Sequence, residues 1–259
     1  METTINIVKS WMATNFLCLN DDKTEVLVIA SKSMHAKLAI PSVKVGDSSI
    51  LPTTSARNIG VKFDNLMNLE SHITETCRSA FYHLSNISKI RQFLTDEACE
   101  RLIHAFVTSK LDINNSLYYG IKDYLMNNLQ HVMNTAARIL TRTPRFTHIT
   151  PTLQDLHWLP VKSRVEFKIN VMTFKALHSE APQYVTEMIE QKVPLYRSSR
   201  SDGQNILKQP KSRTKSYGDR SFYCCSPHLW NNLPTDIRLC NNLSTFKRML
   251  KTHLFEKAY

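Results

Sequence analysis

Residues 69–94 read LESHITETCRSAFYHLSNISKIRQFL, and this stretch decides the fold. Its apolar side chains recur at steps of three and four, which is the spacing of one face of an α-helix. These side chains are Ile73, Cys77, Ala80, Leu84, Ile87, Ile90 and Leu94. The pattern predicts a single long helix, whose apolar face needs packing partners from the rest of the chain.

A second helix is predicted directly after the first. Thr95 is suited to cap its N-terminus, and Asp96 and Glu97 occupy the first turn, where the helix dipole favours negative charge. We expect its inward side chains to be Leu102, Ala105, Phe106 and, as a further candidate, Ile113.

A third helix is predicted over residues 124–140, and Pro144 is expected to prevent its continuation. Its expected core positions are Leu125, Leu129, Val132, Ala136 and either Ile139 or Leu140. Three consecutive helices imply a small helical bundle.

The C-terminal part has shorter elements separated by prolines. A helix over residues 162–177 is apolar around most of its circumference, so it should be central in a second core. Residues 195–217 are polar and basic, and we expect a loop with short strands there. Ser244 is expected to cap a final helix that turns Phe246, Leu250 and Leu254 inward and Lys247, Arg248 and Lys251 outward.

The first 65 residues are expected to be mostly β-structure. A buried strand is predicted at residues 25–30, a hairpin around residues 46–49, and a third strand at residues 58–63. The predicted fold class is therefore α+β, mainly α. A small antiparallel β region (1–68) precedes a helical bundle (69–145) and a mixed, basic C-terminal region (146–259).

Composition indicates a folded chain outside the membrane. Of its 259 residues 42% are hydrophobic, yet no apolar run approaches the roughly 18 residues of a membrane span. Six cysteines without CxxC pairs fit reduced thiols, so we expect an intracellular protein, nuclear or cytoplasmic. Cys224, Cys225 and His228 could be imagined as metal ligands. Because no second ligand pair lies at zinc-finger spacing, we favour small buried cysteines and predict no metal.

Positive charge is concentrated towards the C-terminus. The net charge of +11 divides into 0 for residues 1–72, +3 for residues 73–145 and +8 for residues 146–259. Such density suits a polyanion, although a solvated loop and cations at a helix C-terminus are equally open readings. The candidate nucleic-acid-binding side chains are Arg138, Arg142, Arg145, Arg197, Arg200, Lys208, Lys211, Arg213, Lys215 and Arg220.

Several strings of residues resemble the end of the reverse transcriptase of non-LTR (LINE-type, jockey-like) retrotransposons, over nearly the whole chain. They are WMATNFLCLN (11–20), DKTE (22–25), NIGVKFD (58–64), AFVTSKLD (105–112), NTAAR (134–138), HITP (148–151), LHWLPV (156–161), GDRSF (218–222) and PHLWNNLP (227–234). By this resemblance residues 1–68 are the end of the palm, with its fourth and fifth motifs. Residues 69–145 are then a thumb-like bundle, and residues 146–259 the family's basic C-terminal domain.

The resemblance implies extension of a DNA strand on an RNA template, a reaction in which aspartates hold two metal ions. In the family these aspartates lie on earlier palm strands and would precede Met1. We therefore expect a non-catalytic part of an RNA-directed DNA polymerase that itself needs no cofactor, magnesium belonging to the full-length enzyme. Lys23 matches a family lysine that assists pyrophosphate departure and is expected to be vestigial here. Asp21 and Asp22 are expected to form a solvated turn.

Three functions remain open at this stage. The first is residual, nonspecific binding of RNA or of an RNA–DNA hybrid, and the second is a scaffold or protein-interaction module. An independent enzyme such as a nuclease is the third, although no Cys/His or Ser/His/Asp constellation supports it. Trp158, Trp230, His157 and Tyr217 could stack on bases, but tryptophans flanked by Leu and Pro are more often core residues. The sequence does not indicate an oligomeric state.

Overall fold

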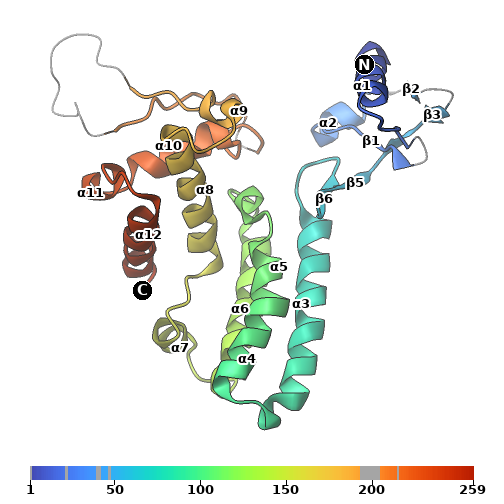
Figure 1. Cartoon of the computed structure of the whole chain (residues 1–259). Coiled ribbons are helices and arrows are strands. Elements are labelled where there is room, and N and C mark those ends of the chain that lie inside the picture. The colour runs from blue at the N-terminus through green and yellow to red at the C-terminus, as the bar shows by residue number, and fades with distance from the viewer. Residues whose placement is uncertain (1, 21–22, 39–41, 46–47, 193–204, 215) are drawn as a thin grey trace, which may run out of the picture. The chain divides into compact units, whose positions relative to one another are not determined.

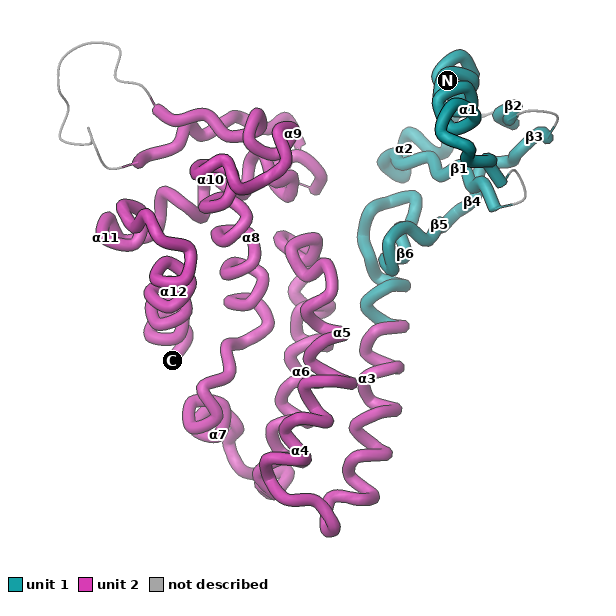
Figure 2. Tube along the Cα trace, in the orientation of Figure 1, with its two compact units in different colours: residues 1–74 teal, residues 75–259 magenta. Residues whose placement is uncertain are grey.

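The computed structural model describes residues 2–20, 23–38, 42–45, 48–192, 205–214 and 216–259. It is mainly helical with a few short strands, which confirms the predicted fold class (Figure 1). The chain divides into two compact units, Met1–Thr74 and Glu75–Tyr259 (Figure 2). The boundary between them falls inside the long helix α3 (Glu70–Ile90). The predicted helical bundle and the predicted C-terminal region, which meet at position 145, therefore both lie in the second unit, apart from the first residues of α3.

The first unit combines one longer helix with very short strands. The hairpin predicted around residues 46–49 is confirmed, because Val43 pairs with Ile50 and Val45 with Ser48 in antiparallel register. The elements are α1 (Glu2–Thr14), β1 (Val26–Leu27), α2 (Lys32–His35), β2 (Val43–Val45), β3 (Ser48–Ile50), β4 (Pro52–Thr53), β5 (Ser55–Asn58) and β6 (Val61–Asp64).

Three predictions for this unit are wrong. The N-terminal residues form α1, not β-structure, and the strand predicted at residues 25–30 shrinks to β1, which pairs in parallel with β4 and is only half-buried. The strand predicted at residues 58–63 is interrupted, because Ile59 and Gly60 both have positive φ (45° and 81°). They form a two-residue turn between the antiparallel strands β5 and β6, where glycine tolerates the left-handed backbone.

The helical bundle follows the predicted order. Thr95 caps α4 as predicted, accepting a hydrogen bond from the Ala98 amide at 3.2 Å. The long helix α6 buries Leu125, Leu129 and Leu140 among its core residues, also as predicted. After α3 the elements are η2 (Arg91–Phe93), α4 (Asp96–Ile103), η3 (His104–Thr108), α5 (Ser109–Asp112), η4 (Asn115–Tyr118) and α6 (Asp123–Thr141).

The inward face of the second helix was predicted in the wrong register. The buried residues are Cys99, Ile103, Val107 and Leu111, whereas Leu102 is half-buried and Ala105, Phe106 and Ile113 are exposed. The reason is the π-helical turn η3 in the middle of the segment. A step of four residues rotates by more than one full turn in an α-helix, which has about 3.6 residues per turn, and by less than one full turn in the wider π-helix. In a helix that mixes the two, these deviations cancel, so residues four apart stay on one side.

The C-terminal core is built around α8 (Val161–Leu177), which packs against α6, α10 and α12 and so has the predicted central position. Phe246 stacks on Phe174 at 4.5 Å and lies 5.6 Å from the ring of Trp230, between ring centroids. The other elements are α7 (Thr150–Asp155), α9 (Gln183–Thr186), α10 (Phe222–Asn231), α11 (Thr235–Arg238) and α12 (Leu243–Ala258).

The final helix begins two residues earlier than predicted. Asn242, not Ser244, caps α12 by accepting a hydrogen bond from the Thr245 amide at 3.0 Å. The faces of this helix are as predicted, with Phe246, Leu250 and Leu254 buried. Among the residues that the structure describes, none of the helices combines the length and apolar character of a bilayer crossing.

Candidate nucleic-acid interface

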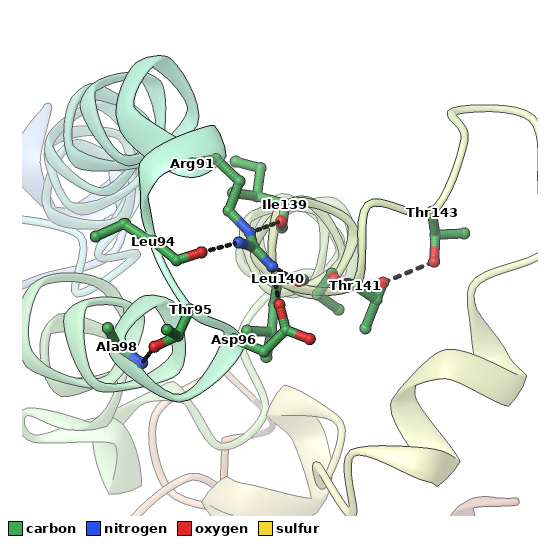
Figure 3. A network of polar contacts seen from close by, with 10 residues as sticks. Arg91, Leu94, Thr95, Asp96, Ala98, Ile139, Leu140, Thr141 and Thr143 are labelled. Atoms are coloured by element: carbon green, nitrogen blue, oxygen red, sulfur yellow. Dashed lines mark hydrogen bonds and ion pairs between the residues drawn. The ribbon is translucent and has the colours of Figure 1, made fainter.

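The C-terminal end of α6 is fixed by a buried arginine, Arg91, which is 7% exposed. Its guanidinium donates to the carbonyls of Ile139 (2.9 Å), Leu140 (2.6 Å) and Leu94 (2.9 Å) and forms an ion pair with Asp96 (Figure 3). The last carbonyls of a helix have no hydrogen-bond partner within the helix, so Arg91 supplies donors to acceptors that would otherwise be buried without a partner. The turn η2 and the end of α6 are thereby joined.

The helix ends at Thr141, and the next residue, Arg142, has left-handed φ (56°) and donates its backbone N–H to the Arg138 carbonyl. Pro144 lies three residues beyond this end, so the helix stops before the proline, as predicted. The hydroxyls of Thr141 and Thr143 lie 2.6 Å apart just beyond this end (Figure 3). Arg138 and Arg142 are four residues apart, a spacing that predicts a shared helix face. Because Arg142 has left the helical backbone, this prediction is wrong. Its side chain is exposed.

Arg138 holds the loop that follows α6. Its guanidinium donates to the carbonyl of Pro144 at 2.6 Å and to that of Thr147 at 2.7 Å. The Thr147 amide donates to the Pro144 carbonyl at 3.2 Å, which closes a turn with Arg145 and Phe146 at its centre. Arg145 is exposed, and Phe146 is 97% exposed. Arg138 is thus a positioning residue, whereas Arg145 and Phe146 face solvent.

Phe146 is the residue that sequence reasoning missed. It belongs to no periodic apolar pattern, so it suggested neither a core position nor a site. A signal was nevertheless available, because residues 124–154 contain no aspartate or glutamate while carrying Arg138, Arg142 and Arg145. An aromatic side chain inside such a segment is a candidate for base stacking.

Arg220 is also occupied by structural contacts. Its guanidinium donates to the carbonyls of Tyr119 (3.1 Å) and Leu117 (3.4 Å), and so connects the residues before α10 with η4. Gly120 has φ of +66°, and a Cβ atom there would lie 2.7 Å from Cγ of Arg220. The close approach therefore depends on glycine at position 120.

Lys208 is exposed but paired. Its Nζ atom lies 2.7 Å from a carboxylate oxygen of Glu190, and this hydrogen bond raises the pKa of Lys208. The backbone groups of the same two residues are also bonded, next to a bridge between Gln191 and Leu207. Part of the positive charge of Lys208 is therefore compensated locally.

The remaining candidates fall into two groups. Lys211 and Arg213 are exposed, like Arg142 and Arg145. Arg197, Arg200 and Lys215 lie outside the described residues, as do residues 195–204 of the predicted loop with short strands. Among the predicted candidates that the structure describes, Arg142, Arg145, Lys211 and Arg213 are thus the side chains best placed to meet a polyanion.

Lys23, which the sequence resemblance predicts to be a vestigial palm residue, has the surroundings of a turn. Lys23 is exposed, and its backbone N–H lies 3.2 Å from the carbonyl and 3.1 Å from the side-chain oxygen of Asn20. Asp21 and Asp22 lie outside the described residues.

The carboxylate of Asp64 accepts hydrogen bonds from the amides of Leu66, Asn68 and Leu69, the last at 2.6 Å, and so fixes the backbone just before α3.

The cysteines are free thiols, as expected. Cys224 and Cys225 lie in α10, where burial raises the pKa of the Cys225 thiol to about 12 and keeps it protonated. His228 instead has its Nδ1 atom 3.1 Å from the side-chain amide of Gln209. No group of three or more metal-ligating side chains occurs in the part of the chain that the structure describes.

The aromatic side chains considered for base stacking differ in how deeply they are buried. Trp230 is fully buried and donates its indole N–H to the Asn205 carbonyl at 2.8 Å, and Trp158 is 5% exposed, so both are core residues. His157 is exposed but stacks on Phe255, with 5.7 Å between centroids. Tyr217 is half-buried.

Comparison of the chain with protein-family models, with curated proteins and with solved structures finds no match in any of the three.

Proposed function

We propose that this chain is part of a non-LTR (LINE-type) reverse transcriptase and binds RNA, or an RNA–DNA hybrid, without sequence preference. One observation carries the binding proposal: the second unit holds all of the net charge. Residues 1–74 contain seven basic and seven acidic side chains, so the net charge of +11 lies in residues 75–259. Arg142, Arg145, Lys211 and Arg213 expose part of this charge to solvent. Contacts of this kind go to phosphates, which position a nucleic acid without reading its sequence.

We propose no polymerase activity for these residues alone. Two-metal nucleotidyl transfer needs aspartates that converge on the metal ions. The only Asp-Asp pair is Asp21-Asp22, and it lacks the aromatic-Ala lead-in of the family's catalytic hairpin. Magnesium is therefore assigned to the full-length polymerase and not to this chain.

Equilibrium binding to a fluorescent RNA–DNA hybrid tests the proposal. Each phosphate contact releases condensed counterions, so affinity should fall steeply between about 50 and 200 mM salt. The double variant Lys211→Glu with Arg213→Glu should weaken binding at least about tenfold. Lys32→Glu with Lys37→Glu changes the net charge equally, at exposed positions of the first unit, and should bind nearly as the parent does. Equal losses in the two variants, or salt-independent binding, would contradict the proposed interface.

A scaffold that docks a protein partner is the second candidate function. It is favoured by helix α1, none of whose residues is buried. Its apolar side chains Ile7 and Trp11 are 65% and 61% exposed, so they are available to a protein partner. Affinity capture after nuclease treatment separates the two functions. Partners lost with the nucleic acid support the first function, and partners that survive and require Trp11 support the second.

A further inference from the structure

The turn between α6 and α7 (Figure 1) contains Phe146, an aromatic residue whose ring is not packed in the core. Phe146 occupies the centre of this turn at 97% exposure, where glycine, asparagine or aspartate are the usual residues. Exposing an aromatic ring to water contributes nothing to the stability of the chain by itself. The ring is therefore available to a ligand.

The turn is held in place before any ligand binds. Arg138 donates to the carbonyls of Pro144 and Thr147, one on each side of the Arg145-Phe146 pair. The helix end that carries Arg138 is in turn fixed by Arg91 through the carbonyls at positions 139 and 140 (Figure 3). A binding element that is already ordered loses little conformational entropy on association. This favours a specific contact by the exposed pair.

The charges around the ring define what it can bind. Arg142 and Arg145 are exposed on either side of the turn's start, and no acidic residue occurs between positions 124 and 154. A cationic, aromatic site matches a ligand with anionic groups next to a flat π-system. Nucleic acid has this chemistry, since phosphates alternate with bases. In a duplex the base faces are covered by their neighbours, so only unpaired bases can stack on a side chain.

We propose that residues 142–147 form a single-strand binding site, in which Phe146 stacks on one unpaired base while Arg142 and Arg145 contact adjacent phosphates. The site rests on the proposed nucleic-acid binding and adds a preference to it. A hybrid duplex is held by distributed charge, whereas an unpaired strand gains the additional stacking contact. Such a site would hold a template or a displaced strand beside a duplex.

The experiment compares two probes, a labelled oligouridine of about 12 nucleotides and an RNA–DNA hybrid of equal length, on the full chain. Phe146→Ala should weaken oligouridine binding about 5- to 150-fold and leave hybrid binding within about twofold. Phe146→Trp should restore or strengthen oligouridine binding, because stacking is regained. Phe16→Ala is the matched control: Phe16 is 99% exposed, but no basic residue lies within six positions of it. This variant should bind both probes as the parent does.

The outcomes distinguish this inference from the proposed function. If the parent binds both probes with steep salt dependence and Phe146→Ala changes neither, or both equally, the single-strand site is wrong and the proposed function stands. If the parent binds neither probe, both are overturned. Binding of anionic vesicles or of an acidic peptide that depends on Phe146, without oligouridine binding, would assign the turn to a different partner. Circular dichroism checks that each variant keeps its helices.

Discussion

The two units of this chain differ in how much of their own apolar surface they bury. In the second unit α3, α4, α6, α8, α10 and α12 all have buried apolar side chains, including Phe174, Trp230 and Phe246. Among the described residues of the first unit, the buried apolar side chains are Val45, Val61, Leu69 and Ile73. Leu69 directly precedes α3, and Ile73 lies in its first turn. The first unit therefore has little core apart from its junction with the long helix.

This difference shows which part of the chain has the properties of an independent fold. Burial of apolar surface is the dominant favourable term in folding, and two- to four-residue strands contribute little without it. The same boundary separates the charges, because residues 1–74 are neutral overall. The second unit thus has both the larger core and the net positive charge, which are the two properties on which the proposed binding rests.

A pair of tryptophan variants tests the comparison with the largest expected effect. Trp230 is fully buried, so Trp230→Ala should lower the free energy of unfolding by about 3–5 kcal/mol. Trp11 is 61% exposed, and Trp11→Ala should cost about 0.5 kcal/mol or less. Urea unfolding followed by circular dichroism measures both. Similar losses in the two variants would mean that the first unit has a core of its own.

Arg91→Ala should be nearly as costly within the second unit. Removing the guanidinium leaves the carbonyls of Ile139 and Leu140 without their partner, at an expected cost of about 2–4 kcal/mol. Arg101→Ala is the control, since its ion pair with Glu97 joins side chains that are 78% and 75% exposed. The same urea experiment should show little change for Arg101→Ala, because exposed pairs contribute little. Equal effects would remove the structural role assigned to Arg91.

The stability of the second unit should fall at high pH because of a buried thiol. The Cys225 pKa is raised by burial from 9.0 to about 12, so between these values the unfolded chain loses a proton that the folded chain keeps. Stability contributed by the neutral thiol is then lost as pH rises above about 9, by about 1.4 kcal/mol per pH unit. Urea unfolding at about pH 8 and about pH 10 should show the loss, and Cys225→Ala should reduce it. The Cys77 thiol, whose pKa burial raises to about 11, contributes a loss of the same sign.

Two helix caps of similar geometry give the smallest effect. Thr95 accepts from the Ala98 amide at 3.2 Å, and Ser31 accepts from the Met34 amide at 3.3 Å. Thr95→Ala should destabilise the second unit by about 1 kcal/mol, because α4 packs into the core. Ser31→Ala should have a smaller effect, since α2 has four residues and none is buried. A larger loss for Ser31→Ala would contradict the contrast between the units.

Sequence patterns predicted the parts of the fold that depend on long periodicity or on local capping. The helices α3, α6 and α8 were predicted because many turns repeat the same apolar spacing, and Thr95 because its cap is a local interaction. The register of Cys99, Ile103 and Val107 was missed, since a π turn has no signature in hydrophobic spacing alone. Ile59 was read as a strand residue because its β-propensity hid the turn that Gly60 permits.

The candidate site was predicted only as a distribution of charge. The sequence identified the basic residues but could not show which ones are committed to backbone carbonyls. Arg138 donates to the carbonyl of Pro144, 6 residues later in the chain. Arg220 donates to the carbonyl of Tyr119, 101 residues earlier. Contacts across such separations depend on the tertiary fold. Phe146 was missed because its proposed role depends on exposure: its ring is 97% exposed, and the sequence pattern does not show this.

Hydrogen exchange with and without an RNA–DNA hybrid tests the central claim most directly. Residues of the second unit should exchange slowly in the free protein, since core helices open only with the whole fold, while α1 and the short strands exchange fast. Addition of the hybrid should slow exchange in the second unit, around the end of α6 and residues 205–214, and leave the first unit unchanged. Protection that appears in Met1–Thr74 and not in Glu75–Tyr259 would contradict the assignment of nucleic-acid binding to the helical unit.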